Sequence, residues 1–435
     1  MYRYTLLCLL LNVYPVLSWA QTFSVEPLDA LSDTELSIQV SELSPGQSVV
    51  IKSEMSDSRG RIWQAQARFM SDQNGVIDLR NQAPESGDYA DVDPMGLIHA
   101  MQIPNSTVPS GRFTLSQNEP MRVRFSLEID SREHAVLNVT RRIASEDLEK
   151  SEVRTGRLLG RFYKPPGHGP YPGVLLLGGS SGGLSGAVKA GLLASHGFAV
   201  LTVAYFAEEG LPPDLQDIPL EYFKESMDWL SAQSSVAPGG VSVYGTSKGA
   251  EAALLVGAHY PEIRSVVAVV PSNVVWRCIC NVEGASSWSL NGEPLPYATP
   301  QNDPTYEQEP GNPFRAATRY LQGLKDQAAV EAARIPVEQI NGPILLVSGT
   351  DDQLWPSYAM SEMIVQQLAE NDFSYEFTHL AMEGAGHSIR SLYLPLAGTT
   401  SIANGRLSLG GTYEGIRGGQ SSWKKIIAFL KKDAR

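Results

Sequence analysis

Gly245-Thr246-Ser247-Lys248-Gly249 is the stretch that decides the fold of this 435-residue chain. The apolar and aromatic run 241–244 precedes it and predicts a short strand, and the run 250–256 follows it and predicts a helix. A turn sharp enough to join the two elements leaves no room for side chains at its first and last positions, which are both glycine. The pentapeptide therefore predicts a strand, a tight turn and a helix, with Ser247 raised above the end of the strand. The alternative is a Gly/Ser loop that joins two elements and carries no chemistry.

Apolar strands alternate with helices over residues 156–435. Near-continuous apolar strands indicate a parallel sheet that is covered on both faces, and helices such as 220–233 between them indicate a doubly wound α/β arrangement. A G-x-S-x-G turn in such a sheet is the nucleophile elbow of α/β-hydrolases, so we expect this fold. The stretch at about 277–340 is rich in Pro, Asn and Tyr and is expected to form a cap over the active site.

Residues 21–140 have a different pattern, in which short alternating segments are separated by turns. Evenly spaced short strands predict a small all-β, immunoglobulin-like sandwich ahead of the α/β-hydrolase region. The polar and charged stretch 141–155 is expected to be the linker between them. The predicted strands of the sandwich include residues 36–40, 48–51, 62–69 and 121–128.

Residues 1–20 have the composition of a secretory signal peptide. Arg3 is the only charge before the apolar run 6–17, and Ser18-Trp19-Ala20 provides small residues at the −3 and −1 positions of a cleavage site. The apolar run is too short to cross a bilayer. We therefore expect an exported protein, periplasmic or secreted; the alternative is an uncleaved N-terminal anchor.

The composition, with 43% hydrophobic and 19% charged residues, is that of a folded globular protein. The formal net charge of −13 argues against nucleic acid and anionic membranes as partners. Beyond Cys8 in the predicted signal peptide, only Cys278 and Cys280 remain, and they form either a disulfide or two buried thiols. A C-x-C pair without further cysteines is weak support for a metal site, and we expect no metal or organic cofactor.

A serine nucleophile needs a histidine base, and the base needs a carboxylate that orients it. In α/β-hydrolases the carboxylate follows the nucleophile and precedes the histidine in the chain. We expect it after the strand at 344–348, where Asp351 and Asp352 compete. The spacing from Gly349 and to Pro356 favours Asp352, and the alternative is a capping role for the helix that begins near Pro356.

His387 is the expected base. It follows the predicted last strand, 373–378, in the loop Gly384-Ala385-Gly386-His387. His379 at the end of that strand is the only rival among the seven histidines.

Two backbone N–H groups must stabilise the oxyanion that forms when the serine attacks. The residue after the nucleophile, Lys248, provides one donor. The loop Gly178-Gly179-Ser180-Ser181-Gly182-Gly183 follows a strand at 173–177 and is expected to provide the other, from Ser180 in preference to Ser181. The same loop could cradle a phosphate, but the lysine of a P-loop is absent.

The whole chain after residue 20 resembles the acyl-CoA thioesterase and bile-acid-CoA:amino-acid N-acyltransferase family. The resemblance rests on motifs in the predicted sandwich, in the hydrolase region and in the cap. These are Ala65-Gln66-Ala67-Arg68, Pro94-Met95-Gly96-Leu97, Gly179 to Leu184, Gly197-Phe198-Ala199-Val200, Ala204-Tyr205, Leu220-Glu221-Tyr222-Phe223, Ser247-Lys248-Gly249, Ser287-Trp288, Gly292 to Pro296, Gly349 to Trp355 and Gly386-His387.

The resemblance implies cleavage of a small-molecule acyl thioester, through an acyl-enzyme formed by Ser247 with Asp352 and His387. Transferase members of the family carry cysteine as the nucleophile, so serine favours water as the acceptor. The alternatives are an exported carboxylesterase or peptidase, acyl transfer to an amine, and a non-catalytic binding protein. Export also separates the protein from cytosolic acyl-CoA, so the sequence leaves the leaving group, the acyl chain length and the oligomeric state open.

Overall fold

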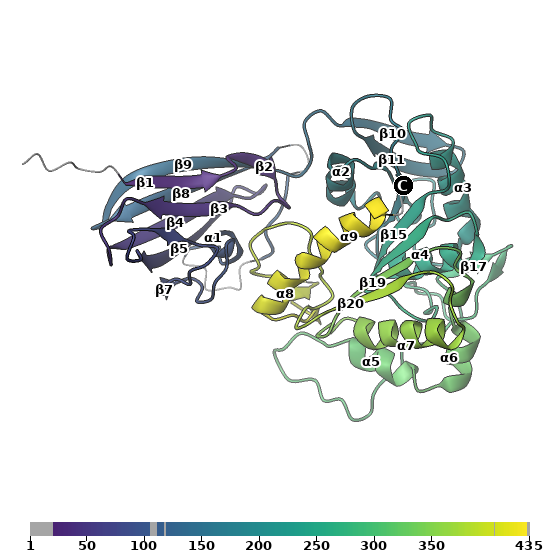
Figure 1. Ribbon diagram of the computed structural model, residues 1–435. Helices are drawn as coiled ribbons and strands as arrows, with labels where there is room; N and C mark the ends of the chain where they lie inside the picture. The colour runs from purple at the N-terminus through teal and green to yellow at the C-terminus, as the bar shows by residue number, and fades with distance from the viewer. Residues whose placement is uncertain (1–20, 105–110, 117–118, 404, 433–435) are drawn as a thin grey trace, which may run out of the picture.

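The computed structural model describes residues 21–104, 111–116, 119–403 and 405–432. The predicted signal peptide, residues 1–20, lies outside the described residues. Figure 1 shows a β-sandwich on the left and a larger α/β region on the right, with helices α8 (Tyr413–Gly419) and α9 (Ser421–Lys432) between them. Within the described ranges, no helix is both long and apolar enough to cross a bilayer.

The sandwich contains a six-stranded sheet in the order β2-β9-β8-β4-β5-β7 and a three-stranded sheet in the order β1-β3-β6. Alternate residues of the central strands point inward, and in β5 these are Trp63, Ala65, Ala67 and Phe69. The four predicted strands are confirmed. The strands are β1 (Thr22–Glu26), β2 (Asp29–Leu31), β3 (Ser37–Ser41), β4 (Ser48–Ser56), β5 (Ile62–Met70), β6 (Ile77–Asp78), β7 (Ser86–Gly87), β8 (Met121–Ile129) and β9 (Arg132–Arg142), with the short helix α1 (Gly96–His99) after β7.

The second region is built on an eight-stranded sheet in the order β10-β11-β13-β12-β15-β16-β19-β20. The pairs β10–β11 and β11–β13 are antiparallel and all the others are parallel. Its strands are β10 (Glu149–Thr155), β11 (Leu158–Lys164), β12 (Gly173–Leu177), β13 (Ala199–Ala204), β15 (Ser242–Thr246), β16 (Ser265–Val269), β19 (Ile344–Gly349) and β20 (Phe377–Met382).

Helices cover both faces of this sheet, as the continuous apolar strands predict. Successive residues of β12 alternate between two apolar cores: Val174 and Leu176 belong to one, Leu175 and Leu177 to the other. The helices α2 (Ala187–Ser195) and α9 pack on the first face, and α3 (Leu220–Ser231), α4 (Lys248–His259) and α7 (Ser357–Glu370) pack on the second. The predicted doubly wound α/β-hydrolase sheet preceded by a β-sandwich is confirmed.

The predicted linker, 141–155, is wrong at both ends. Strand β9 continues to Arg142 and β10 begins at Glu149, so only residues 143–148 connect the two sheets. β10 is an edge strand, and six of its seven side chains are exposed. Polar and charged side chains are what an edge strand in water requires, and they give it the composition of a linker.

The predicted last strand, 373–378, is displaced toward the N-terminus. Strand β20 spans Phe377–Met382, and Phe373 instead packs its ring against Tyr375 and Phe377 ahead of the strand. Aromatic residues have high strand propensity, but Phe373 and Tyr375 lie ahead of the ladder, which begins at Phe377.

The predicted cap region lies between β16 and β19. It contains two short strands, two short helices and a single 3-10 turn, around a small core that includes Val274, Trp276 and Trp355. The elements are β17 (Trp288–Leu290), β18 (Glu293–Pro294), α5 (Ala317–Gly323), α6 (Gln327–Ala333) and η1 (Val337–Gln339), and β14 (Ile218–Pro219) pairs with β17 from outside the region.

The sandwich and the α/β region share one continuous apolar core, which joins sandwich residues to α2 and α9. Polar contacts also cross the interface between the sandwich and the α/β region, which we call the seam. Asp33 of the sandwich accepts a hydrogen bond from Trp423 Nε1 at 2.7 Å and pairs with His196 Nε2 at 2.6 Å. His99 Nε2 lies 3.1 Å from Gln420 Oε1. The seam is therefore packed and hydrogen-bonded rather than a flexible junction.

Candidate active site

Ser247 occupies the tight turn between β15 and α4, where the sequence places it. Its φ of 58° and ψ of −125° lie in a sparsely populated region for a residue with a side chain. A Cβ on Gly249 would lie 2.2 Å from the carbonyl oxygen of Gly178, and one on Gly245 would lie 2.0 Å from that of Gly249. Both glycines are therefore required by the close approach of neighbouring backbone, and the turn holds Ser247 partly exposed above the sheet.

Ser247, His387 and Asp352 form one chain of hydrogen bonds. His387 Nε2 lies 3.0 Å from Ser247 Oγ, and His387 Nδ1 lies 2.8 Å from Asp352 Oδ2. The three side chains come from the ends of three different strands, separated by 105 and 35 positions in the chain. The sheet thus brings together the three residues that the sequence predicted, at distances suited to proton transfer.

Asp352, and not Asp351, reaches the imidazole. The other oxygen of Asp352 accepts the backbone N–H groups of Leu354 and Trp355 at 3.1 and 3.2 Å, and Oδ2 also accepts from Ser357 Oγ at 2.6 Å. These donors hold the carboxylate in one orientation. Asp351 instead accepts the backbone N–H of Gly411 at 2.8 Å and so braces the loop that follows.

The rival histidine, His379, has different partners. Its Nε2 lies 2.7 Å from Ser348 Oγ and its Nδ1 lies 2.7 Å from Glu362 Oε1. Neither partner belongs to the Ser247 turn. His387 itself is fixed by its backbone N–H, which donates to the carbonyl of Leu409 at 2.7 Å, and by a T-shaped contact between its ring and the Trp355 ring.

The proposed oxyanion donors differ in how closely the structure relates them to Ser247. Lys248 is the first residue of α4, where a helix leaves its N–H groups without intrahelical partners. In the Gly178–Gly183 loop, the residue against the nucleophile is Gly179: a Cβ there would lie 3.2 Å from Ser247 Cβ. Ser180 is exposed, and its role as second donor stays a prediction.

Tyr205 holds this loop in place, a role that was not predicted from the sequence. Its hydroxyl donates to the carbonyl oxygens of Gly178 and Gly179, at 2.6 and 3.3 Å. Burial raises the pKa of the Tyr205 hydroxyl, so it stays protonated and remains a donor. In the sequence, the signal for this role is a tyrosine that directly follows the apolar strand β13.

A buried ion pair lies next to Ser247, at the start of α4. Lys248 Nζ lies 2.6 Å from Glu251 Oε1, and both side chains are almost fully buried. The same Glu251 oxygen accepts Trp288 Nε1 at 2.7 Å and the backbone N–H of Trp276 at 3.2 Å. Burial lowers the pKa of Lys248 and raises that of Glu251, while each charge favours the charged form of the other. The sequence signal was one acid in the otherwise apolar part of α4.

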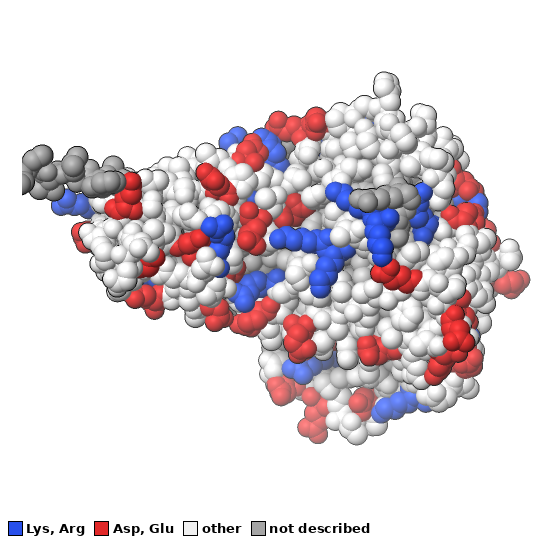
Figure 2. All heavy atoms as spheres, viewed as in Figure 1, with Lys and Arg blue, Asp and Glu red and all other residues white. Residues whose placement is uncertain are grey.

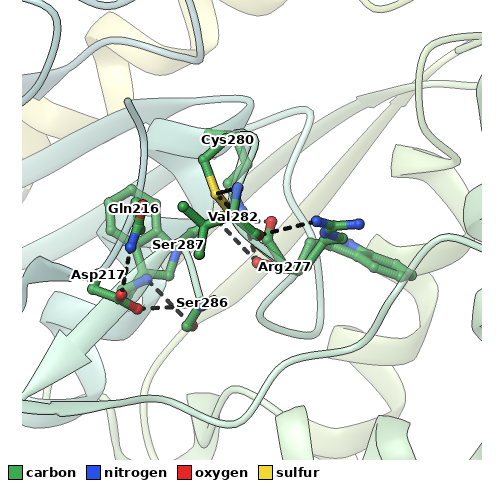
Figure 3. Close-up of a disulfide and its surroundings, with 11 residues drawn as sticks. Gln216, Asp217, Arg277, Cys280, Val282, Ser286 and Ser287 are labelled. Carbon is green, nitrogen blue, oxygen red and sulfur yellow. Dashed lines mark hydrogen bonds between the residues drawn. A yellow bond between two sulfur atoms is a disulfide. The ribbon is translucent and has the colours of Figure 1, made fainter. Parts of the chain in front are cut away.

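This ion pair connects the predicted cap region to the start of α4, next to Ser247. Trp276 and Trp288, which contact Glu251, flank a loop that is closed by a disulfide between Cys278 and Cys280 (Figure 3). Ser287 Oγ donates to the carbonyls of Trp276 and Arg277, at 2.9 and 3.0 Å. Of the two states left open for the cysteines, the structure contains the disulfide.

The strand order and the strained turn are those of the α/β-hydrolase fold, and the hydrogen-bonded serine, histidine and aspartate lie at the positions where this fold can hold a catalytic triad. Within the described ranges, no three His, Cys, Asp or Glu side chains gather closely enough to hold a metal ion.

Comparison with known proteins places the chain in one family. The model for the "Acyl-CoA thioester hydrolase/BAAT N-terminal region" matches residues 33–155, and the model for "BAAT / Acyl-CoA thioester hydrolase C terminal" matches residues 218–435. The chain belongs to this family of acyl-CoA thioester hydrolases and bile acid-CoA:amino acid N-acyltransferases.

Similar relatives include both kinds of enzyme. Acyl-coenzyme A amino acid N-acyltransferase 1 of Mus musculus is 31% identical over 426 residues, covering 93% of this chain and 96% of the relative. Acyl-coenzyme A thioesterase 6 of Mus musculus is 29% identical over 432 residues, covering 95% and 97%. Bile acid-CoA:amino acid N-acyltransferase of Homo sapiens is 28% identical over 425 residues, covering 93% and 96%.

Proposed function

We propose that this protein hydrolyses acyl thioesters of the acyl-CoA type through an acyl-enzyme on Ser247. The observation that carries the proposal is the chain of hydrogen bonds from Ser247 through His387 to Asp352. A serine becomes a nucleophile when a neighbouring base accepts its proton, and His387 Nε2 is in position to accept it.

In the first half of the reaction, Ser247 Oγ attacks the thioester carbonyl carbon while its proton passes to His387 Nε2. Asp352 stabilises the imidazolium that forms. The backbone N–H of Lys248 and a donor from the glycine loop stabilise the oxyanion. The carbon–sulfur bond then breaks, and the departing sulfur takes the proton from His387, which releases a thiol and leaves the acyl group esterified to Ser247.

In the second half, water attacks the ester. His387 removes a proton from the water and returns it to Ser247 Oγ, which releases the carboxylic acid. An amine in place of water would give an amide, which is the acyl-transfer alternative that the N-acyltransferase relatives suggest. The relatives named as thioesterases support hydrolysis.

We also propose that the protein acts outside the cytosol. Residues 1–20 have the composition of a signal peptide. The disulfide between Cys278 and Cys280 supports export, because disulfides persist mainly in oxidising compartments.

A substrate panel tests the reaction class. The purified protein is given acyl-CoAs of graded chain length, matched aryl esters, and matched amides, each with and without an amino acid acceptor, and products are identified by mass spectrometry. We expect free acid from the thioesters. Turnover of esters or amides without any thioester cleavage would favour the carboxylesterase or peptidase alternative, and an acyl-amino acid product would favour transfer.

A further inference from the structure

The ion pair in the first turn of α4 has a cost that stability does not explain. Figure 2 shows the usual place of charged groups, with Lys, Arg, Asp and Glu side chains at the surface in contact with water. Lys248 and Glu251 are instead 3% and 0% exposed, and Glu251 Oε2 has no hydrogen-bond partner among the described residues. A buried ion pair is weak support for stability, because the loss of water around both charges offsets their attraction. The pair therefore needs a role beyond stability.

The pair is bonded through the backbone to Ser247. Lys248 directly follows Ser247, and its backbone N–H is the expected oxyanion donor. The backbone N–H of Glu251 donates to the carbonyl of Ser247 at 3.1 Å, and that of Ala250 donates to the same carbonyl at 2.8 Å. A shift of this helical turn therefore moves both the serine and the donor beside it.

The side chains of the pair are fixed from the predicted cap region. Lys248 Nζ donates to Glu251 Oε1 at 2.6 Å and to the carbonyl of Trp276 at 3.4 Å. It also lies 5.4 Å from the centre of the Trp288 ring, within reach of a cation–π interaction. Glu251 Oε1 accepts Trp288 Nε1 and the backbone N–H of Trp276 as well. Each side chain of the pair thus contacts both tryptophans, so the pair cross-links the first turn of α4 to the predicted cap region.

The same part of the predicted cap region reaches the base. The rings of Trp276 and Tyr320 meet edge to face, with their centres 4.8 Å apart. Tyr320 meets Trp355 in the same way at 5.9 Å, and Trp355 meets His387 at 5.9 Å. The backbone N–H of Trp355 also donates to Asp352. One row of rings therefore joins the first turn of α4 to the histidine and the aspartate.

The charge of Lys248 makes a carboxylate acceptable at this position. Glu251 lies one helical turn after Ser247, so without a partner its negative charge would repel an oxyanion that forms at the serine. Lys248 supplies the opposite charge 2.6 Å from the carboxylate. A pair of zero net charge can fix the turn without opposing the charge that develops in the reaction.

We propose that Lys248 and Glu251 are positioning residues for the reaction at Ser247, and that their ion pair fixes the Lys248 backbone N–H where the oxyanion forms. This inference rests on the proposed function. An oxyanion donor acts in the transition state, so its displacement lowers kcat and leaves KM nearly unchanged. Loss of a whole donor lowers kcat about 10²–10³-fold, and a displaced donor should cost part of this factor.

Steady-state kinetics separates positioning from stability. Lys248→Met, Glu251→Gln and the double variant are compared with the wild type on the best substrate. The double variant removes both charges, so it should regain most of the stability that either single variant loses. We expect its kcat to stay about tenfold or more below wild type, with KM within threefold. Asp93→Asn breaks the buried pair with His99 in the sandwich and is the matched control, which should lose stability but keep kcat within threefold.

A trifluoromethyl ketone analogue of the substrate measures the oxyanion site itself. Ser247 Oγ adds to the ketone carbonyl, and the adduct carries a tetrahedral oxyanion. We expect the inhibition constant of the double variant to rise by the factor by which kcat/KM falls, about tenfold or more. The matching secondary alcohol cannot form the oxyanion and should bind both proteins equally.

Hydrogen exchange needs no turnover, so it distinguishes failure of this inference from failure of the proposed function. In the Ser247→Ala background, the backbone N–H groups of Ala250 and Glu251 should exchange about tenfold faster or more when Lys248→Met and Glu251→Gln are added. Peptides from the sandwich should exchange at unchanged rates. Two results overturn the positioning role: a double variant whose kcat recovers together with its stability, or exchange at these two amides that does not change. If no substrate is turned over, the exchange result alone decides.

Discussion

Two sites in the α/β region each combine a serine, a histidine and an acidic residue at similar distances. At the first, His387 lies 3.0 Å from Ser247 and 2.8 Å from Asp352. At the second, His379 lies 2.7 Å from Ser348 and 2.7 Å from Glu362. By distance alone, the second set is the tighter one.

What separates the two sites is the surroundings of the serine and of the acid. Ser348 is 0% exposed within the regular strand β19, whereas Ser247 stands partly exposed on a strained turn at the start of a helix. The carboxylate side chain of Glu362 is 52% exposed, and that of Asp352 is 1% exposed and fixed by three further donors. Access for a substrate, oxyanion donors and a fixed carboxylate therefore distinguish a catalytic arrangement from a structural one, and hydrogen-bond distances do not.

Substitution of the two histidines should give the largest difference in kcat. His387→Ala should lower kcat on the best thioester on the order of 10⁴-fold or more, because the serine loses its base. His379→Ala removes only a contact between β19, β20 and α7 and should change kcat less than threefold. Both rates are measured on protein shown by circular dichroism to be folded. Equal losses in the two variants would mean that the assignment of the base is wrong.

The variants of the acidic residues should differ in kcat by a somewhat smaller factor than the two histidine variants. Asp352→Asn should lower kcat about 10³-fold, because the amide no longer stabilises the imidazolium. Asp351→Asn should cost less than tenfold, through the Gly411 loop, and Glu362→Gln less than twofold. A larger effect at Asp351 than at Asp352 in the same assay would reverse our choice of acid.

The Lys248–Glu251 pair tests the effect of a buried carboxylate on stability. Lys248→Met or Glu251→Gln alone should lower the free energy of unfolding by about 3–5 kcal/mol, because one charge stays buried without its partner. The double variant removes both charges and should recover most of this loss. Chemical denaturation measures all three proteins, and additive losses in the double variant would contradict an ion pair.

Asp33→Asn should have the smallest effect on the free energy of unfolding, and this effect should depend on pH. Burial alone would raise the pKa of Asp33, but hydrogen bonds from His196 and Trp423 lower it below 3.8. A carboxyl group with a lowered folded pKa stabilises the protein above the unfolded value of 3.8, and this contribution is lost as pH falls through the folded pKa. Asp33→Asn should therefore cost about 2 kcal/mol at neutral pH.

The cost of Asp33→Asn should shrink toward zero as pH falls below 4. Thermal unfolding of the wild-type and Asp33→Asn proteins between pH 3 and 7 measures this cost. A cost that stays constant across this range would contradict a charged Asp33 at the seam.

The candidate catalytic residues could be predicted because chain order and glycine spacing constrain them. Gly245 and Gly249 are required by backbone contacts that only glycine permits, and Asp352 follows β19, a fully buried strand with a continuous apolar run. His387 was found from the Gly-x-Gly-His loop, although the strand before it was predicted at displaced bounds. The order of nucleophile, acid and base then leaves few candidates.

The features that were missed depend on neighbours distant in sequence. Glu251 is buried only because Trp276 and Trp288 cover it, and β10 is a strand only because β11 pairs with its polar edge. A single sequence records none of these contacts.

Labelling with a fluorophosphonate probe tests the central claim most directly, since the probe reacts only with an activated serine. We predict that the probe modifies the wild-type protein at Ser247, that Ser247→Ala abolishes the label, and that Ser348→Ala retains it in full. Labelling that persists in a folded Ser247→Ala protein, or no labelling of the folded wild type, would contradict the account.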